Sequence, residues 1–278
     1  MTTADRVLAH LSRRTTSGEF IPEIDGLRFA SITLVVFFHL SGYAVAKAAA
    51  PHLANPFDDW VAHIAATGHY GVQLFFIISG FVLALPFARH YLAGAPAPKL
   101  RAYYLRRLTR LEPPYVIAMV LIFVVATLFF GASARLLLPH LLASLVYVHN
   151  LVYGTGSTVN VVAWSLEVEV QFYILAPLLA LVFTIASVWL RRAFIIAAIA
   201  ATITVQAFGV SQDARLSLTL LNYIQFFLLG FLLADLYLTE WRQAPAHETA
   251  WDVVGVSAWI ALVAVWVKEP RPLVLFSI

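Results

Sequence analysis

The fold is decided by the stretch IPEIDGLRFASITLVVFFHL, residues 21–40. Its apolar run is long enough to cross a bilayer, yet it contains Arg28 and His39. Eleven positions separate these residues, which places their side chains about 20° apart around a helix and about 16 Å apart along it. Because an ionisable residue inside a membrane-spanning helix costs about 2.5–3.5 kcal/mol on insertion scales, two on one face predict a polar path into the protein.

The composition extends this interpretation to the whole chain. Of its 278 residues, 61% are hydrophobic and 12% are charged, which is about half the charged fraction of a soluble domain. Apolar runs of about 20 residues recur, and the short alternating segments of a membrane β-barrel do not. We therefore predict an all-α, polytopic transmembrane helix bundle that forms a single domain over residues 1–278. The absence of cysteine excludes disulfides and thiolate catalysis, and we expect no nucleic-acid partner.

Apolar runs predict about nine spans. They lie near residues 24–46, 68–88, 113–131, 136–153, 164–190, 193–210, 217–238 and 251–267, and a last one begins near Pro272. The chain ends about seven residues into this last run, so we expect a truncated C-terminus that lacks one or two helices. The Pro113-Pro114 pair suits the start of the third span.

Basic residues predict the orientation of the bundle. The basic loop 89–112 is expected to be cytoplasmic, together with an N-terminal segment of residues 1–20. Segment 136–153 is interrupted by polar residues, and the distribution of charge does not decide whether it crosses the membrane. Two possibilities therefore stay open, with either Arg191 and Arg192 or Arg215 on the cytoplasmic side.

His39 is the first candidate for chemistry. A neutral imidazole can accept a proton from a hydroxyl or attack a thioester, although a histidine that only bonds a neighbouring helix is an equally ordinary use. Arg28 could hold an anion that enters from the cytoplasm, or extend its side chain to the interface.

The second predicted span contains a small-residue motif, GVQLFFIISGFVL, residues 71–83. Gly71, Ser79 and Gly80 allow close helix packing. Gln73 is the polar exception, and it could reach the same cavity as His39.

The run YYLRRLTR, residues 103–110, is amphipathic and basic. Arg106, Arg107 and Arg110 could bind phosphates in forked geometry. Attraction to anionic lipid headgroups is the simpler alternative.

A second anomaly is WSLEVEVQFYILAP, residues 164–177. Glu167 and Gln171 share a helix face and are possible cavity or acceptor-binding residues, whereas Glu169 points about 200° away from Glu167. Carboxylates at membrane depth must be paired, protonated or in a watery cavity. Glu169 could orient His39, stabilise an imidazolium or bind acceptor hydroxyls; placement at the membrane interface is the alternative.

The other polar residues give weaker evidence for a functional role. His149 and Asn150 are possible cavity residues, and Asp235 is expected near a helix end. His69 is expected to be a solvated loop residue, like His52 and His63. HExxH, Walker A and GxSxG motifs are absent, so we predict no metal site and no bound cofactor.

Four segments together resemble the acyltransferase 3 family of integral-membrane O-acyltransferases. They are PEIDGLRFASITLVVFFH, GVQLFFIISGF, RRLTRLEPPY and AWSLEVEVQFYILAP, in this order. The resemblance covers about residues 20–240. It implies a ten-helix fold in the cell membrane with a cytoplasmic N-terminus, and it favours counting 136–153 as a span.

The resemblance also implies an activity. Such proteins transfer an acyl group, often acetyl, from cytoplasmic acyl-CoA as co-substrate to a hydroxyl of an extracytoplasmic carbohydrate or glycoconjugate. It implies that His39 is catalytic with support from Arg28, that Glu169 belongs to the acidic signature, and that Arg107 and Arg110 act on the donor side. Many members have Asp at the position of Gln73 and Glu at that of Val170, so neither acid is obligatory here.

Two other classes of function stay open. A transporter or flippase would use Arg28, His39 and Glu169 as a proton or substrate relay. A non-catalytic membrane component would bind acyl-CoA without turnover that depends on His39.

Overall fold

A computed structural model describes residues 21–47, 67–209, 213–241, 253 and 257. These residues contain helices and no strand, and six of the helices are long and apolar enough to cross a membrane. The helices are α2 (Pro22–Lys47), α4 (Tyr70–Ala93), α5 (Leu100–Phe129), α6 (Ala134–Leu145), α7 (His149–Tyr153), α8 (Trp164–Leu179), α9 (Val188–Ala207) and α10 (Leu220–Thr239), with 3-10 turns η1 (Thr67–His69), η2 (Val161–Ala163) and η3 (Ala180–Thr184). The helix bundle is therefore confirmed; the predicted spans at 251–267 and from Pro272 lie outside the described residues, apart from Val253 and Ser257.

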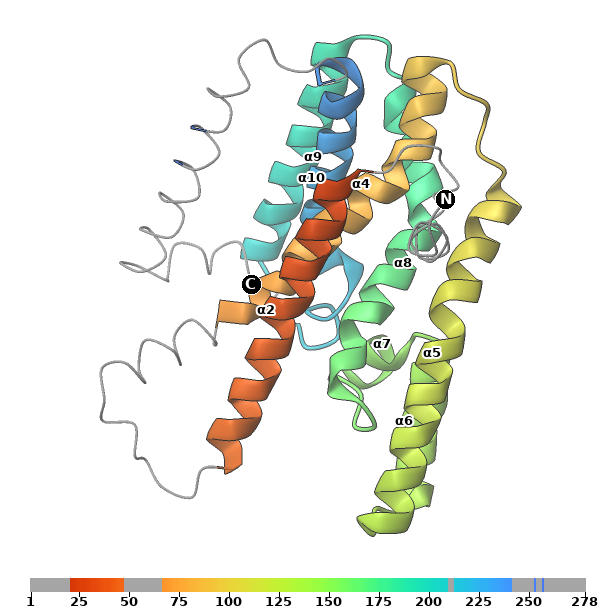
Figure 1. Cartoon of the computed structure of the whole chain (residues 1–278), viewed down its shortest axis with the longest axis vertical. Coiled ribbons are helices and arrows are strands. Elements are labelled where there is room, and N and C mark those ends of the chain that lie inside the picture. Colours follow the sequence, from red (N-terminus) through yellow and green to blue (C-terminus); the bar gives the residue numbers. More distant parts are fainter. Residues whose placement is uncertain (1–20, 48–66, 210–212, 242–252, 254–256, 258–278) are drawn as a thin grey trace, which may run out of the picture.

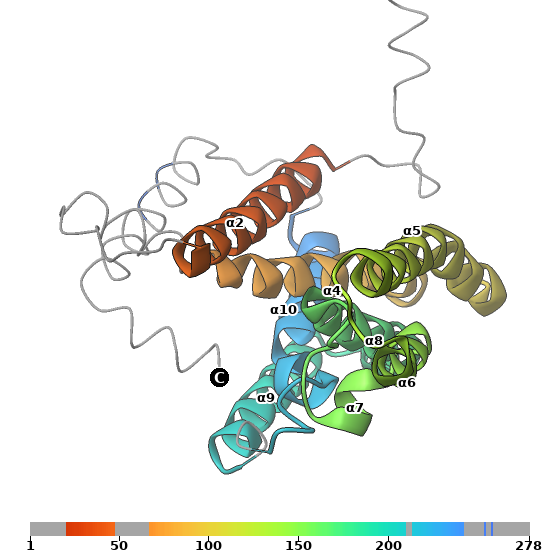
Figure 2. The same ribbon diagram turned by 90° about the horizontal axis from the view of Figure 1, so that it is seen from below.

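The centre of the bundle is the crossing of α4 and α10 (Figure 2). A Cβ atom on Gly80 would lie 2.2 Å from the backbone oxygen of Phe227, and one on Gly230 would lie 2.3 Å from that of Ile77. Glycine at both positions is therefore what lets the two backbones touch. Around the crossing, Phe227 stacks between Phe76 and Phe172, with ring centroids 4.7 and 4.0 Å away.

Gly80→Ala is expected to lower the free energy of unfolding by about 1–3 kcal/mol, because the new methyl group meets backbone atoms that cannot rotate away. Gly42→Ala is the matched control, since a Cβ atom there has nothing within 4 Å. Thermal unfolding of the two purified variants measures the difference. Equal melting temperatures would contradict the close α4–α10 crossing.

Helix α2 lies at the edge of the bundle and packs against α4 (Figures 1 and 2). A Cβ atom on Gly71 would lie 2.5 Å from the backbone oxygen of Ser31, so this contact is also close. Large apolar side chains such as Phe29 and Phe37 remain exposed on the other face of α2. The predicted packing role of Gly71 and Gly80 thus agrees with the structure.

Helices α5 and α8 run antiparallel, which settles the course of the segment between them. The Tyr103 hydroxyl donates to the Tyr173 carbonyl at 3.1 Å, and further along α5 Tyr115 lies within electrostatic range of Glu167, earlier in α8. The chain therefore returns to the end where α5 finished before α8 begins. Helix α6 has 12 residues, or about 18 Å, too short for a hydrocarbon core of about 30 Å.

Segment 136–153 is consequently re-entrant, and the expectation that it counts as a span is wrong. Its two histidines and its asparagine are accommodated by protein contacts that lipid could not provide. The count of about nine spans is not confirmed either. Arg191 and Arg192 lie at the same end as the start of α5, because α8 and then α9 follow in alternating directions (Figure 1).

The prediction that Pro113-Pro114 opens a helix is also wrong, because α5 begins at Leu100 and contains both prolines. Most of the predicted basic loop 89–112 is therefore helical, and only residues 94–99 are not. Interior prolines remove helix hydrogen bonds. The helix is held on either side of them, since Tyr103 bonds α8 and the Tyr115 hydroxyl donates to the Ser144 carbonyl at 2.9 Å.

A buried ion cluster joins α9 to α10. Arg191 Nε lies 2.5 Å from one Asp235 oxygen and Arg192 Nε lies 2.8 Å from the other. Arg191 and Asp235 are 1% and 0% exposed. Arg192 also reaches Glu240 at 2.5 Å. At the opposite end of the same helix pair, Gln206 and Gln225 exchange amide hydrogen bonds.

Candidate active site

Glu169 is the centre of a buried hydrogen-bonded group. One of its carboxylate oxygens accepts from the Ser79 hydroxyl of α4 at 2.7 Å and from the Tyr173 hydroxyl, one turn further along α8, at 2.5 Å. Glu169 is only 5% exposed. A buried carboxylate requires such partners, and these two bonds fix its orientation.

Two predicted arginines lie within electrostatic range of Glu169, namely Arg28 of α2 and Arg107 of α5. Arg28 forms an ion pair with Asp25 at 3.0 Å. The guanidinium carbon of Arg107 lies 4.1 Å from the centre of the Tyr103 ring, and its NH1 group donates to the Tyr103 carbonyl at 3.2 Å. The structure thus brings Arg28, Arg107 and Glu169 together from three helices.

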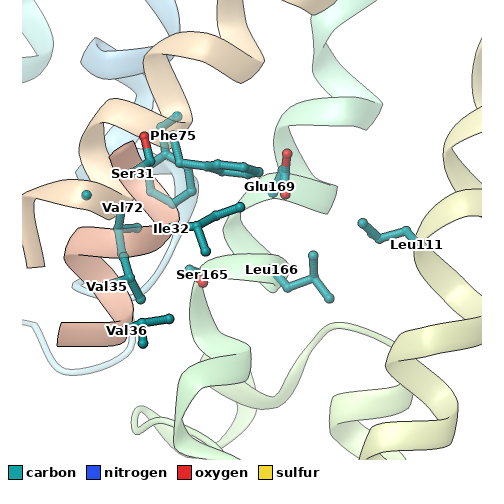
Figure 3. A pocket seen from close by; sticks show the side chains of 12 residues that line it. Ser31, Ile32, Val35, Val36, Val72, Phe75, Leu111, Ser165, Leu166 and Glu169 are labelled. Atoms are coloured by element: carbon teal, nitrogen blue, oxygen red, sulfur yellow. The ribbon is translucent and has the colours of Figure 1, made fainter. Parts of the chain in front are cut away.

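A cavity of about 310 Å³ lies beside Glu169, between α2, α4, α5 and α8 (Figure 3). Figure 3 shows Ile32, Val35 and Val36 on α2 facing across this space toward Glu169 and Leu111. Most of its lining is apolar, and the polar side chains are Ser31, Ser165 and Glu169. The cavity can therefore hold a largely apolar chain. The few polar groups of such a chain would lie beside these three polar side chains.

A second cavity of about 120 Å³ contains His39. It shares Val35 and Val72 with the first cavity, so the two lie on either side of a common wall. Gln73 also lines it, as the sequence suggested, and its Oε1 atom is buried and has no hydrogen-bond partner within the described ranges. His39 itself is exposed on one side.

His69 also lines the second cavity, so its expected place as a solvated loop residue is wrong. Phe38 lies between the two imidazoles, with ring centroids 5.2 Å from His39 and 5.9 Å from His69. The position of His69 depends on how η1 docks on α2, and the sequence carries no signal for it.

Three predicted cavity residues lie elsewhere, and none lines either cavity. Glu167 accepts from the Asn150 backbone N–H at 2.9 Å, at the start of α7. Gln171 accepts from the Leu220 N–H at 2.8 Å, at the start of α10. His149 is fully buried, with its Nε2 atom 2.8 Å from His140 Nδ1. Burial lowers the pKa of His149.

The remaining predicted donor residues, Arg106 and Arg110, are exposed on α5. Tyr173 and Asp25 were missed by the sequence analysis, although both were within its reach. Tyr173 lies four residues after Glu169, and Asp25 three residues before Arg28, which are the spacings of neighbours on a helix face. Within the described ranges, no three His, Asp or Glu side chains are grouped so as to hold a metal ion.

Comparisons with known proteins identify the family of the chain. The family model that matches the chain is described as an acyltransferase domain of the acyltransferase 3 type, and it covers residues 21–272. No solved structure matches.

Two curated relatives illustrate the similarity. The peptidoglycan O-acetyltransferase OatA of Listeria monocytogenes is 28% identical over 184 residues, which are 62% of this chain and 26% of that protein. The O-acetyltransferase OatA of Staphylococcus aureus is 28% identical over 174 residues, 58% of this chain and 25% of its own length. The chain thus matches about a quarter of the length of these relatives. It belongs to the acyltransferase 3 family, and it carries the several apolar helices of a multi-pass membrane protein.

Proposed function

We propose that this chain transfers an acyl group, acetyl by analogy with its relatives, from cytoplasmic acyl-CoA to a hydroxyl of an extracytoplasmic carbohydrate or glycoconjugate. The observation that carries the proposal is the pair of cavities that meet at Val35 and Val72. One lies beside Glu169 and the two arginines, and the other contains His39. In this orientation the N-terminal end of α5 faces the cytoplasm and the protein lies in the cell membrane.

The donor is proposed to bind at the start of α5. Arg106 and Arg110 are exposed there and present guanidinium groups that suit the CoA phosphates. Arg107 is half-buried and lies closer to the interior, next to Tyr103 and Tyr173. The largely apolar cavity beside Glu169 would take the pantetheine arm with its thioester.

The chemistry is proposed to take place at His39. In the direct route His39 accepts the proton of the acceptor hydroxyl, the new C–O bond forms at the thioester carbonyl, and the C–S bond breaks. The proton then passes to the departing CoA thiolate. In the alternative route His39 takes the acyl group first and passes it to the hydroxyl. Holding both reactants in adjoining cavities supplies the proximity that either route needs.

Glu169 is proposed to act from a fixed position at the donor end. Its bonds to Ser79 and Tyr173 hold the carboxylate close to Arg28 and Arg107. Its negative charge can therefore hold both guanidiniums beside the path of the donor. It also offsets the repulsion between two positive charges in a water-poor interior.

The transporter alternative is not favoured, because the family match is to acyltransferases. Purified protein incubated with acetyl-CoA and an acceptor separates the two functions. We expect release of free CoA thiol together with an acetylated product. Substrate movement across vesicles without loss of the thioester would instead support transport.

Arg107→Ala is expected to raise the KM for acetyl-CoA by at least about tenfold, because a guanidinium near the donor path is worth about 1.5–3 kcal/mol in charged hydrogen bonds. Arg101→Ala is the matched control, since Arg101 is exposed on the same helix. Initial rates at varied acetyl-CoA concentration measure both variants. An unchanged KM in Arg107→Ala would remove this residue from the donor site.

A further inference from the structure

The second cavity contains a buried acceptor atom that no group in the described part of the chain satisfies. Gln73 is 8% exposed, and its Oε1 atom has no hydrogen-bond partner among the described residues. Leaving a buried acceptor unpaired costs about 1–3 kcal/mol. Because this atom belongs to a side chain that lines a cavity, the missing donor fits a ligand that occupies the cavity.

An aromatic wall stands beside Gln73 in the same cavity. Trp164, the first residue of α8, and Tyr223 of α10 both line it, with ring centroids 5.1 Å apart. Both rings pack against Phe76, at 6.5 and 5.6 Å, and Phe76 is 1% exposed. The wall is therefore held in place by the core before any ligand arrives.

The cavity lies toward the end of the bundle opposite the basic start of α5. Gln73, Trp164 and Tyr223 all come from the first turns of their helices. These first turns are at the end where α5 finishes, since α4, α8 and α10 each run toward the end where α5 begins (Figure 1). A ligand of this cavity would thus come from the side opposite the donor.

The size of the cavity limits what enters it. About 120 Å³ is the space of roughly four water molecules at about 30 Å³ each. That space accommodates one hydroxyl-bearing part of a sugar ring, and the remainder of the molecule must extend outside. Trp164 is only partly buried, so part of its side chain stays accessible.

We infer that this cavity is the acceptor subsite, in which Trp164 and Tyr223 contact the apolar face of a sugar ring and Gln73 Oε1 accepts a hydrogen bond from a sugar hydroxyl. His39 then lies in the same cavity, beside the hydroxyl that receives the acyl group. This inference rests on the proposed function and assigns specificity to three residues. Aromatic walls with a few polar groups are typical of small-molecule sites.

The experiment separates acceptor binding from donor binding. Full-length protein in nanodiscs is given radiolabelled acetyl-CoA and, in turn, chitotriose, cellotriose and maltotriose, and the best of these acceptors is used for kinetics. Gln73→Leu keeps a similar volume and removes the acceptor atom, and Trp164→Ala removes the wall. Trp189→Ala is the control, because Trp189 is 81% exposed on α9.

We expect Gln73→Leu and Trp164→Ala to raise the acceptor KM by at least about tenfold, with the KM for acetyl-CoA changed less than about twofold, since each removes a contact worth about 1–3 kcal/mol. Trp164→Phe keeps an aromatic ring and is expected to retain most of the affinity, which also provides a folded variant if the alanine form does not assemble.

Two results would overturn the inference in different ways. If the sugars stimulate acetyl transfer but both variants keep the acceptor KM of the unmodified protein, the subsite is wrong and the proposed function stands. If no sugar stimulates thioester cleavage by the unmodified protein, the proposed function is wrong. This inference is then wrong as well, because it depends on that function. An acceptor KM raised as much in Trp189→Ala would also contradict the assignment.

Discussion

His39→Ala is expected to lower acyl transfer by about 10²–10⁴-fold, the usual contribution of a general base. The physical reason is that His39 lines the second cavity together with Gln73, across Val35 and Val72 from Glu169. Loss of the imidazole removes the proposed proton acceptor of the direct route and the proposed nucleophile of the alternative route. The measurement is the initial rate of acetyl transfer by purified protein, at saturating acetyl-CoA.

The control for this prediction is Leu40→Ala, on the same helix turn. Leu40 is 61% exposed and lines neither cavity, so its variant is expected to transfer at close to the unmodified rate. Both variants should insert and purify alike, because His39 makes no buried packing contact. Transfer by His39→Ala within tenfold of the unmodified protein would rule out His39 as the catalytic base or nucleophile.

Asp235→Ala is expected to lower the free energy of unfolding by about 3–5 kcal/mol, the usual cost of removing one partner from a buried ion pair. Asp235 is the carboxylate that both Arg191 and Arg192 contact, one through each oxygen. Without it Arg191, which is 1% exposed, keeps a positive charge in the interior, and among the described residues only the Ile185 carbonyl still accepts from it, at 2.7 Å. The melting temperature of the detergent-purified protein should fall by several degrees.

Glu240→Ala is the matched control for the ion cluster. Glu240 also pairs with Arg192, but its side chain is 51% exposed, and exposed pairs contribute about 0–1 kcal/mol. We therefore expect a small change in the melting temperature for Glu240→Ala and a large one for Asp235→Ala. Equal changes would show that burial of Asp235 does not determine the stability of the α9–α10 pair.

Several features of the site follow from helix periodicity alone. The spacing of Arg28 and His39 places them on one face of α2. The angle of about 200° between Glu167 and Glu169 means that the two carboxylates contact different elements. The structure agrees with the second expectation, since Glu169 bonds Ser79 of α4 whereas Glu167 bonds the start of α7. Local angular relations of this kind need no tertiary information.

Other predictions failed where two segments meet. Pro113 and Pro114 indicate a helix start locally, but the contacts of Tyr103 and Tyr115 hold one helix across them. Segment 136–153 is apolar enough to suggest a span, but its polar groups bond one another and α8 in a re-entrant turn. The sequence does not indicate that His69 lines a cavity, because the other lining residues come from α2, α4, α8 and α10.

The sequence by itself determined the class of the protein, its main helices and its family resemblance, and it supplied the candidate site residues Arg28, His39, Arg107 and Glu169. It could do so because apolar length, helix periodicity and motif order are properties of consecutive residues. The tertiary structure alone decided which of these residues meet, that the two cavities share a wall, and that Trp164, Tyr223 and His69 line the cavity of His39. Such relations depend on how closely helices approach, and that is set by remote pairs such as Gly80 and the Phe227 backbone.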